Sequence, residues 1–187
     1  MNLPNFLTCF RVVLAALFLF LLFLPGAVFK GMALFVFLSA SLTDYYDGRI
    51  ARKKNVITGF GKLMDPIADK ILTISAFLAF AKMAIMPVWM AAAIIARDIF
   101  ITGFRLFLPE KGNVRAAGPS GKQKTALQFT VIIGVLIFLT LRETVCWDPE
   151  WTPNTLRVIY WSMLLIVAMT LSSGVSYVVK NKKVFSS

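Results

Sequence analysis

The stretch DYYDGRIARKKNVITGFGKLMDPIADK (residues 44–70) interrupts a strongly apolar chain with a dense group of charges. It holds four of the nine acidic residues of the chain, together with six lysines and arginines. Apolar runs precede and follow it. A polar segment between two apolar runs predicts two neighbouring helices that are joined by a short turn in contact with water. The four acidic residues are Asp44, Asp47, Asp65 and Asp69.

The apolar runs on either side of this stretch belong to a pattern that covers the whole chain. Of the 187 residues, 58% are hydrophobic, and the mean hydropathy is +0.77. A bilayer-spanning helix needs about 20 mainly apolar residues, and shorter runs reach that length when charges near their ends snorkel or face the protein interior. A soluble domain of this size could not bury so much apolar surface, so we expect an all-α integral membrane protein. The uncharged runs are 12–29, 31–43, 71–81, 83–96, 125–141 and 158–179.

The breaks between these runs predict a bundle of six transmembrane helices in a single domain, residues 1–187. Proline, glycine and polar clusters mark the breaks, for example LPG at 24–26 and PEKGN at 109–113. The first run has no Lys or Arg before Arg11 and no small-residue cleavage site after it, so we interpret it as a retained helix rather than a signal peptide. The expected helices are 6–25, 31–53, 61–81, 84–108, 120–141 and 156–180.

Lysines and arginines predict the orientation of this bundle. The connections on one side hold thirteen basic residues, and those on the other side hold four. Because cytoplasmic loops carry the excess of Lys and Arg, both termini and the basic face are expected in the cytoplasm, with the protein in the inner cell membrane. That face could also attract anionic lipids or phosphate-bearing substrates. No nucleic-acid partner is expected, because the charges flank apolar spans. The basic side comprises 49–62, 105–124 and 180–183, and the opposite side carries Lys30, Lys82, Arg142 and Arg157.

The four aspartates have the spacing of residues that share helix faces. Asp44 and Asp47 are three apart, and Asp65 and Asp69 are four apart, so each pair lies on one side of its helix. Antiparallel neighbouring helices would bring the pairs together, and carboxylates this close at low dielectric require cations between them. Neighbouring lysines and arginines are one source, and divalent metal ions are another. Since all the donors are oxygens and the chain has no histidine, the metal hypothesis favours Mg²⁺ or Mn²⁺ over zinc.

Glycines beside the aspartates favour a bound metal and phosphate over simple charge neutralisation. Gly48 and Gly61 lie on the aspartate-bearing faces, although glycine destabilises a helix interior. Small residues there would let a ligand approach the backbone closely. Mg²⁺ sites of this kind usually complete their coordination with substrate phosphates. On these grounds alone, a cation-transport site and a purely structural site stay open as alternatives.

The full spacing resembles the signature of the CDP-alcohol phosphatidyltransferase family at every specified position. Eight residue identities at defined gaps on two helices make the match specific. Three further segments resemble the branch of the family that uses glycerol 3-phosphate, namely NLPNFLTCFR (2–11), ARDIFITGFR (96–105) and GKQKTALQ (121–128). The signature is Asp44-x2-Asp47-Gly48-x2-Ala51-Arg52-x8-Gly61-x3-Asp65-x3-Asp69.

The resemblance implies an enzyme that transfers the phosphatidyl group of CDP-diacylglycerol to sn-glycerol 3-phosphate, giving phosphatidylglycerol phosphate and CMP. It implies that the four aspartates hold two divalent cations, Mg²⁺ or Mn²⁺, over the donor pyrophosphate. Asp65 and Asp69 would be the catalytic residues, with Asp69 as the general base. Family members that this chain resembles form homodimers among membrane lipids, so a homodimer is expected here as well.

The resemblance and the charge pattern together supply candidates for the two substrate sites. Asn5 and Thr8 could instead cap the first helix. Arg97 lies deep within its helix, where ions are usually functional or paired. A purely structural Arg97–Asp98 pair is disfavoured, because adjacent helix residues do not face each other. Candidates for the CDP-diacylglycerol site are Asn5, Thr8, Gly48, Ala51, Arg52 and Gly61, and those for the acceptor phosphate are Arg97, Arg105, Arg115, Lys122 and Lys124.

Three alternative functions stay open at this point. The same family could act on another acceptor, such as inositol phosphate, serine or phosphatidylglycerol. Intramembrane prenyl transfer also uses aspartate-rich helices, but its paired motifs usually lie far apart in a longer chain. A divalent-cation transporter would need polar groups along the outer halves of the helices, and those halves are nearly all apolar here.

Overall fold

The structure is a computed structural model in which part of the chain is described. The backbone is described over residues 3–54, 59–107, 119–144 and 150–180, and side chains over 10–43, 70–104, 124–144 and 150–177 and at Val179. Within these ranges the chain is helical and contains no strand, as the sequence predicts. The helices are α1 (Leu3–Phe23), α2 (Ala27–Lys54), α3 (Gly59–Lys82), α4 (Val88–Phe107), α5 (Pro119–Arg142) and α6 (Trp151–Lys180).

The order of the helices is as predicted, but several boundaries differ. α2 begins at Ala27, four residues before the expected start, directly after Gly26 with its positive φ of 107°. α4 begins at Val88 instead of residue 84, because the chain turns through Ala84, whose φ is 56°. α6 begins at Trp151 instead of residue 156. Its early proline, Pro153, does not prevent this, since the first turn of a helix has no hydrogen bond for a proline to remove.

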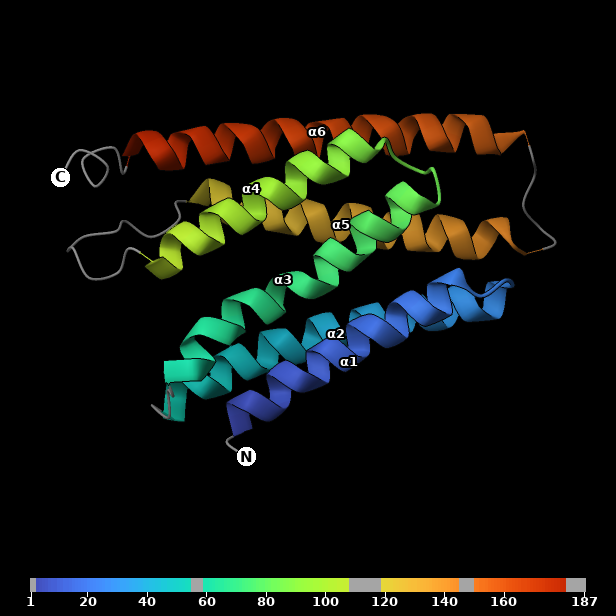
Figure 1. Ribbon diagram of the computed structural model, residues 1–187. Coiled ribbons are helices and arrows are strands. Elements are labelled where there is room, and N and C mark those ends of the chain that lie inside the picture. The colour runs from blue at the N-terminus through green and yellow to red at the C-terminus, as the bar shows by residue number, and fades with distance from the viewer. Residues whose placement is uncertain (1–2, 55–58, 108–118, 145–149, 181–187) are drawn as a thin grey trace.

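Consecutive helices run in opposite directions, so their ends gather at two ends of the bundle (Figure 1). We call the end where α1, α3 and α5 begin and where α2, α4 and α6 finish the signature end. The opposite end holds the turns that join α1 to α2 and α3 to α4 (Figure 1). The helix ends therefore alternate between the two ends of the bundle, and the membrane topology stays a prediction.

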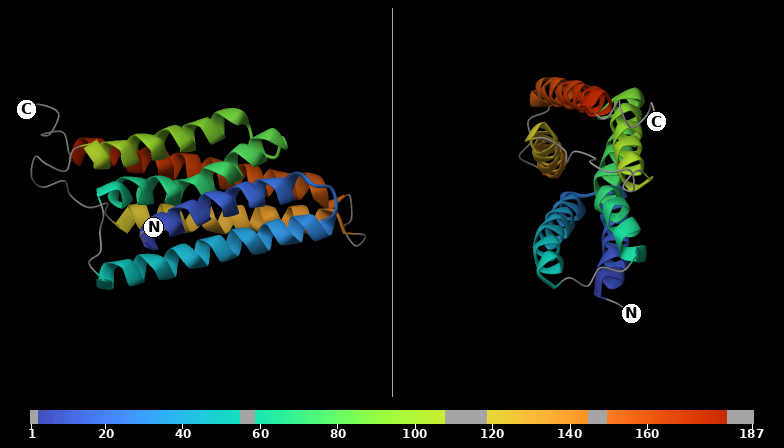
Figure 2. Two further views of the ribbon diagram at one scale, coloured as in Figure 1. Left: turned by 60° about the horizontal axis from the view of Figure 1, so that its bottom comes forward. Right: turned by 90° about the vertical axis from the view of Figure 1, so that its left-hand side faces the viewer.

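The helices form two groups that α3 connects. α1 packs on α2 and α3, whereas α4 and α5 both pack on α6. α3 leaves the α1–α2 group near the signature end and leans toward α4 at the opposite end (Figures 1 and 2). α2 also packs against α5, which closes the bundle on the other side. After the signature aspartates, α3 therefore runs from the α1–α2 group toward the group of α4, α5 and α6.

Aromatic and aliphatic side chains fill the core of the bundle. Phe18 of α1 and Phe37 of α2 are fully buried, with ring centroids 5.6 Å apart. Phe37 also lies 5.8 Å from the ring of Phe129 on α5. On α3, Phe77 and Phe80 are buried in the same apolar core. In a membrane, van der Waals contact between closely packed side chains drives helix association, so this core helps to hold α1, α2, α3 and α5 together.

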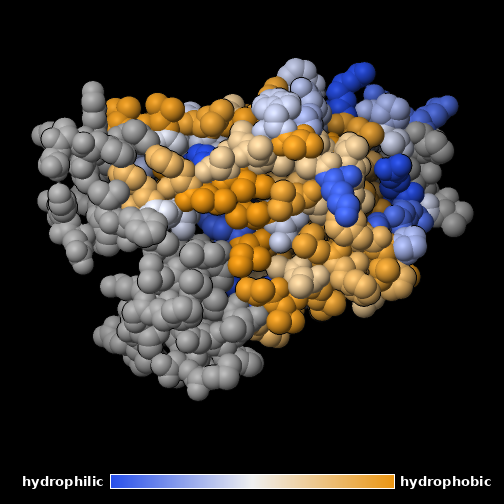
Figure 3. Space-filling view, viewed as in Figure 1, coloured by the Kyte–Doolittle hydropathy of each residue, from blue (hydrophilic) through white to orange (hydrophobic). Residues whose placement is uncertain are grey.

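The outer surface is also apolar, which is unusual for a soluble domain. Val13, Phe35, Leu78 and Val175 are each more than half exposed, and apolar residues cover much of the described surface in Figure 3. Among the residues whose side chains are described, two segments are long and apolar enough to cross a membrane, judged by length and composition: Lys124–Arg142 and Trp151–Tyr177. Shorter apolar segments lie in α1 and α2. The structure thus supports a membrane protein, and six spans stay a prediction.

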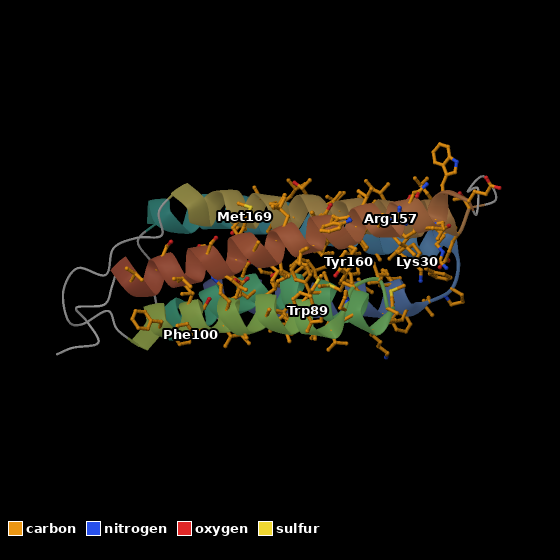
Figure 4. The ribbon with its side chains drawn as sticks, turned by 90° about the horizontal axis from the view of Figure 1, so that it is seen from above. Lys30, Trp89, Phe100, Arg157, Tyr160 and Met169 are labelled. Atoms are coloured by element: carbon orange, nitrogen blue, oxygen red, sulfur yellow. The ribbon has the colours of Figure 1, made fainter. Side chains whose placement is uncertain are left out.

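A buried lysine closes the opposite end of the bundle. Lys30 is 4% exposed, and its Nζ donates hydrogen bonds to the carbonyl oxygens of Leu22 (2.6 Å) and Leu24 (2.8 Å) at the end of α1. The same Nζ lies 3.5 Å from Oε1 of Glu143, after α5. Oε2 of Glu143 accepts a hydrogen bond of 2.5 Å from the N–H of Gly26. Lys30 is therefore a structural cross-link as well as a charge on the predicted outer side, where Arg157 also lies (Figure 4).

Candidate functional site

The signature aspartates lie on two helices that meet at the signature end. Asp44 and Asp47 belong to the last part of α2, and Asp65 and Asp69 to the first part of α3. Both segments have helical backbone, so the predicted face-sharing within each pair is consistent with the backbone. The two helices are antiparallel and consecutive (Figure 1). The side chains of all four aspartates lie outside the described residues, and their convergence on metal ions stays a prediction.

Most of the other candidates are placed by their backbone only. The donor-site candidates on α2 and α3 lie in helical backbone, and their side chains are outside the described residues. α1 begins at Leu3, so Asn5 and Thr8 lie inside the helix and not at its N-cap position, which removes the capping alternative. Arg115 lies outside the described residues altogether. Donor-site candidates placed in this way are Asn5, Thr8, Gly48, Ala51, Arg52 and Gly61, and acceptor-site candidates are Arg105 on α4 and Lys122 on α5.

Arg97 and Lys124 are the acceptor candidates whose side chains the structure describes, and both contact Asp98. Oδ1 of Asp98 accepts hydrogen bonds from Nη1 of Arg97 (3.0 Å) and from Nζ of Lys124. Nζ of Lys70, on α3, lies 3.8 Å from Oδ2 of Asp98. Nη2 of Arg97 donates a hydrogen bond of 2.9 Å to Oγ of Ser173 on α6. We call these five residues the Asp98 cluster.

Arg97 and Asp98 do pair, although adjacent helix residues were not expected to face each other. The two residues are adjacent on α4, and their Cβ atoms do point in different directions. The arginine side chain is long enough to turn back, however, and its planar guanidinium presents several donors at once. One nitrogen therefore reaches Asp98 while another reaches Ser173. Spacing rules for short side chains do not apply to this pair.

Gly174 provides the space for Arg97 against α6. A Cβ atom added at Gly174 would lie 3.3 Å from Cγ of Arg97 and 3.6 Å from its Nε. The first distance is tighter than ordinary van der Waals contact, so any larger residue would move the arginine. The glycine thus helps to set the position of the guanidinium between Asp98 and Ser173.

The Asp98 cluster carries more positive than negative charge. Three cations surround one carboxylate, so the five residues have an excess of two positive charges. Asp98 is 4% exposed and the side chain of Lys124 is 3% exposed, whereas that of Lys70 is 25% exposed. Buried charges are costly unless they are paired. The arrangement is therefore suited to an additional anion, which would balance the excess.

Buried polar atoms without a partner occur on the same helices as the cluster. Among the described residues, Nε of Arg97, Nε2 of Gln128 and Oγ1 of Thr170 are buried atoms without a hydrogen-bond partner. Gln128 follows Lys124 by one turn of α5, and Thr170 precedes Ser173 by one turn of α6. Each unmet hydrogen bond costs about 1–3 kcal/mol. A polar group from water or from a substrate is expected to satisfy them.

Part of this cluster was not predicted from the sequence. Lys70 is one of the six lysines and arginines of the stretch 44–70, which were considered only as neutralising charges for the aspartates, and neither Ser173 nor Gln128 was a candidate. A polar residue within an otherwise apolar helix was the available signal, because such residues usually face the protein interior. Among the described residues there is no group of three or more potential metal ligands of the Cys, His, Asp and Glu types. The metal hypothesis therefore rests on the four signature aspartates, outside those residues.

Comparison with known proteins identifies the family. The family model described as CDP-alcohol phosphatidyltransferase matches residues 1–172. A Bacillus subtilis protein is 37% identical, over 73% of this chain and 77% of its own length, and one from Yersinia enterocolitica is 35% identical over the same shares. A Rickettsia felis protein is 30% identical over 98% of this chain and 97% of its own. All three are named CDP-diacylglycerol–glycerol-3-phosphate 3-phosphatidyltransferase. The chain therefore belongs to the CDP-alcohol phosphatidyltransferase family of enzymes.

Proposed function

We propose that this protein transfers the phosphatidyl group of CDP-diacylglycerol to sn-glycerol 3-phosphate and so acts as a phosphatidylglycerophosphate synthase. The relatives named for this reaction support the choice of both substrates. The structural observation that carries the proposal is the meeting of Arg97 and Lys124 in one buried cationic cluster. The cluster includes Lys70, which directly follows the signature residue Asp69. An anion-binding group thus adjoins the predicted catalytic segment.

The acceptor phosphate is the anion that would balance the cluster. A phosphate monoester carries a charge of about −1.5 to −2 at pH 7, which is close to the excess charge around Asp98. Arg97 and Lys124 would bind its oxygens, because charge-assisted hydrogen bonds to phosphate are strong. Further candidates for binding the acceptor phosphate are Arg105 near the end of α4, Lys122 near the start of α5, and Arg115 in the sequence between these two helices.

The four signature aspartates fit a pair of divalent cations by the chemistry of their donors. Carboxylate oxygens suit Mg²⁺ and Mn²⁺, and the family is generally dependent on divalent metals. Two such ions, when bound, would stabilise charge on the attacking and leaving oxygens at the donor pyrophosphate. Asp44 and Asp47 of α2 and Asp65 and Asp69 of α3 would be the ligands.

Asp69 would also take part in the proton transfer. The hydroxyl oxygen of the acceptor forms a bond to the phosphatidyl phosphorus, and the bond from that phosphorus to the CMP oxygen breaks. The hydroxyl proton passes to the carboxylate of Asp69, which acts as the general base. Asp65 would orient the same reaction centre. Arg52 would contact the donor phosphates or the cytidine. The small residues Gly48, Ala51 and Gly61 would leave room for the nucleotide beside the α2 and α3 backbone. Asn5 and Thr8 on α1 are the further candidates for donor binding.

The proposed setting is the cell membrane, with six spans and the signature end facing the cytoplasm. The excess of Lys and Arg at that end supports this orientation. Exposed apolar residues around the bundle (Figure 3) would face lipid tails and the acyl chains of the donor. Exposed Trp151 and Trp161 lie toward the opposite end, where aromatic residues favour the membrane–water interface. A homodimer within the membrane belongs to the same proposal.

Replacing Arg105 by alanine is expected to raise the apparent KM for sn-glycerol 3-phosphate by roughly 10-fold. Loss of one charge-assisted hydrogen bond costs about 1.5–3 kcal/mol, and each 1.4 kcal/mol is a factor of ten. The KM for CDP-diacylglycerol should change less than about twofold. Steady-state kinetics in detergent would measure both constants. Arg142→Ala, at the opposite end, is the control with unchanged constants. An equal rise in both KM values for Arg105→Ala would contradict a role in acceptor binding.

The acceptor is tested by offering one candidate at a time. Purified protein in detergent is incubated with CDP-diacylglycerol and Mg²⁺, and CMP release is followed with sn-glycerol 3-phosphate, inositol 1-phosphate, serine or phosphatidylglycerol. The proposal predicts rapid release with sn-glycerol 3-phosphate only. Faster release with one of the other three acceptors would overturn the choice of substrate while leaving the family unchanged.

A further inference from the structure

Asp98 has no part in the chemistry proposed above, yet it is the centre of the described polar contacts on α4. The residue is 4% exposed, and burying a carboxylate costs several kcal/mol unless cations and hydrogen bonds compensate for the lost water. A protein that needed only cations near a phosphate would not require a competing carboxylate among them. Its presence calls for a function of its own.

The two oxygens of Asp98 hold different parts of the bundle. Oδ1 accepts hydrogen bonds from Arg97 and from Lys124, and these are the two described residues proposed to bind the acceptor. Oδ2 faces Lys70 of α3 at 3.8 Å. One carboxylate therefore links α3, α4 and α5, and the hydrogen bond from Arg97 to Ser173 extends the link to α6.

Lys70 connects Asp98 to the segment that carries the proposed general base. It is the residue directly after Asp69, so its backbone is covalently bonded to that of the proposed general base. α3 belongs with α1 near the signature end, whereas α4, α5 and α6 form the other group. The contact between Lys70 and Asp98 crosses from one group to the other. It connects the helix of the proposed metal ligands to the helices of the proposed acceptor site.

Electrostatics explain why a carboxylate is needed at this position. Lys70, Arg97 and Lys124 would repel one another in a buried site, and before the acceptor arrives no phosphate is present to hold them. Lys124 is too deeply buried to turn its Nζ to water. A carboxylate between the three cations keeps their donors at defined positions, and its single charge leaves an excess that a phosphate can balance.

We propose that Asp98 is a positioning residue of the transfer reaction, which holds Arg97 and Lys124 in place and, through Lys70, in register with Asp69. It would touch neither substrate. This inference rests on the proposed function, because it assumes that Arg97 and Lys124 bind the acceptor phosphate. Preorganisation of this kind affects rate strongly, since a misplacement of about 1 Å can cost about 100-fold.

The first test compares Asp98→Asn, Asp98→Glu and the wild type in steady-state kinetics. For Asp98→Asn we expect the KM for sn-glycerol 3-phosphate to rise at least about 10-fold, with the KM for CDP-diacylglycerol changed less than about twofold. Asp98→Glu keeps the charge and should recover most of the loss. Glu143→Gln is the matched control, because it removes the acidic partner of a buried lysine at the opposite end. This variant should lower the melting temperature and leave the KM values for both substrates unchanged.

A second variant keeps the test decisive even if Asp98→Asn does not fold. Lys70→Met retains the contacts of Asp98 with Arg97 and Lys124 and removes the link to α3. The expected result is a kcat that falls by roughly 10-fold, with a KM for sn-glycerol 3-phosphate within about threefold of wild type. If Lys70 had a purely structural role, Lys70→Met would instead lower the melting temperature without lowering kcat selectively relative to KM.

The outcomes separate this inference from the proposed function. Wild-type protein that makes no product from sn-glycerol 3-phosphate would overturn the proposed function, and the inference with it. Active wild type together with unchanged acceptor kinetics in folded Asp98→Asn or unchanged kcat in Lys70→Met would overturn the inference alone. Equal losses for both substrates in Asp98→Asn, with a melting temperature lowered as in Glu143→Gln, would also overturn it.

Discussion

Replacing Asp65 by asparagine is expected to lower kcat by roughly 1,000-fold while the protein still inserts and purifies normally. In the proposed site, Asp65 is a ligand of the divalent cations, and an amide is a poorer ligand than a carboxylate. Metal stabilisation of the transition state is worth several kcal/mol, and each 1.36 kcal/mol corresponds to a factor of ten in rate. The measurement is CMP release by protein from the membrane fraction, at saturating CDP-diacylglycerol and sn-glycerol 3-phosphate.

Asp44→Asn should behave in the same way, because the two aspartates contribute to one metal pair from α2 and α3. Glu150→Gln is a suitable control, since Glu150 is an exposed acidic residue that precedes α6 at the opposite end. It should retain wild-type kcat. Normal turnover by folded Asp65→Asn or Asp44→Asn would rule out the two-metal assignment, whatever the identity of the acceptor.

Replacing Lys30 by methionine is expected to cause the largest loss of stability. The substitution keeps the volume of the side chain but removes the charge that contacts the carbonyls of Leu22 and Leu24 and the carboxylate of Glu143. The carbonyl groups at the end of α1 would then lack these partners. Hydrogen bonds to charged groups are worth about 1.5–3 kcal/mol each, and part of that loss is recovered because Glu143 is partly exposed. A net loss of about 3 kcal/mol would lower the melting temperature by roughly 6–10 °C.

The control for this prediction is Lys82→Met. Lys82 is an exposed lysine at the end of α3, and its Nζ lies 4.7 Å from the centroid of the Phe23 ring. An exposed cation–π contact is worth about 0.5–1 kcal/mol, so the melting temperature should fall by less than about 3 °C. Thermal unfolding in one detergent would compare the variants. A melting temperature of Lys30→Met equal to that of Lys82→Met would show that the buried cross-link does not stabilise the bundle.

The activity of Lys30→Met provides a further check on the placement of the site. Asp44 lies 14 residues after Lys30 on the same helix, about 21 Å along the axis. The loss of stability should therefore leave kcat unchanged at temperatures well below the melting transition.

The sequence predicted the helices well because their signals are strong. Long apolar runs, charges at their ends and breaks such as LPG at 24–26 define six segments, and the described part of the chain contains six helices in that order. The boundary of α6 was missed because the segment before Val158 is polar and contains Pro153. Those properties suggest a loop, although a proline in the first turn is compatible with a helix.

The site was predictable only as far as helical spacing determines it. The signature positions lie on helical backbone, so their sharing of faces follows from periodicity alone. The contact between Arg97 and Asp98 depends on the reach of a long side chain, and the contact of Lys70 with Asp98 depends on how α3 crosses toward α4. Neither property is encoded in the spacing of residues along one helix.

The cross-link of Lys30 was hidden for a different reason. A lysine close to a helix end in a membrane protein usually marks topology, and from the sequence Lys30 was interpreted in this way. Its partners include backbone carbonyls, which every residue has and which therefore leave no signal in the sequence. The match to the CDP-alcohol phosphatidyltransferase family over residues 1–172 settles the class of protein in favour of the enzyme over a cation transporter or a prenyl transferase.

The most direct test of the central claim is the incorporation of ³²P-labelled sn-glycerol 3-phosphate into lipid by purified wild-type protein. The reaction contains CDP-diacylglycerol with Mg²⁺, and a parallel reaction contains EDTA. We predict a labelled lipid with the mobility of phosphatidylglycerol phosphate, formed together with an equal amount of CMP and absent with EDTA. Folded protein that forms no labelled lipid, or that forms it at the same rate in EDTA, would contradict a metal-dependent phosphatidyl transfer to sn-glycerol 3-phosphate.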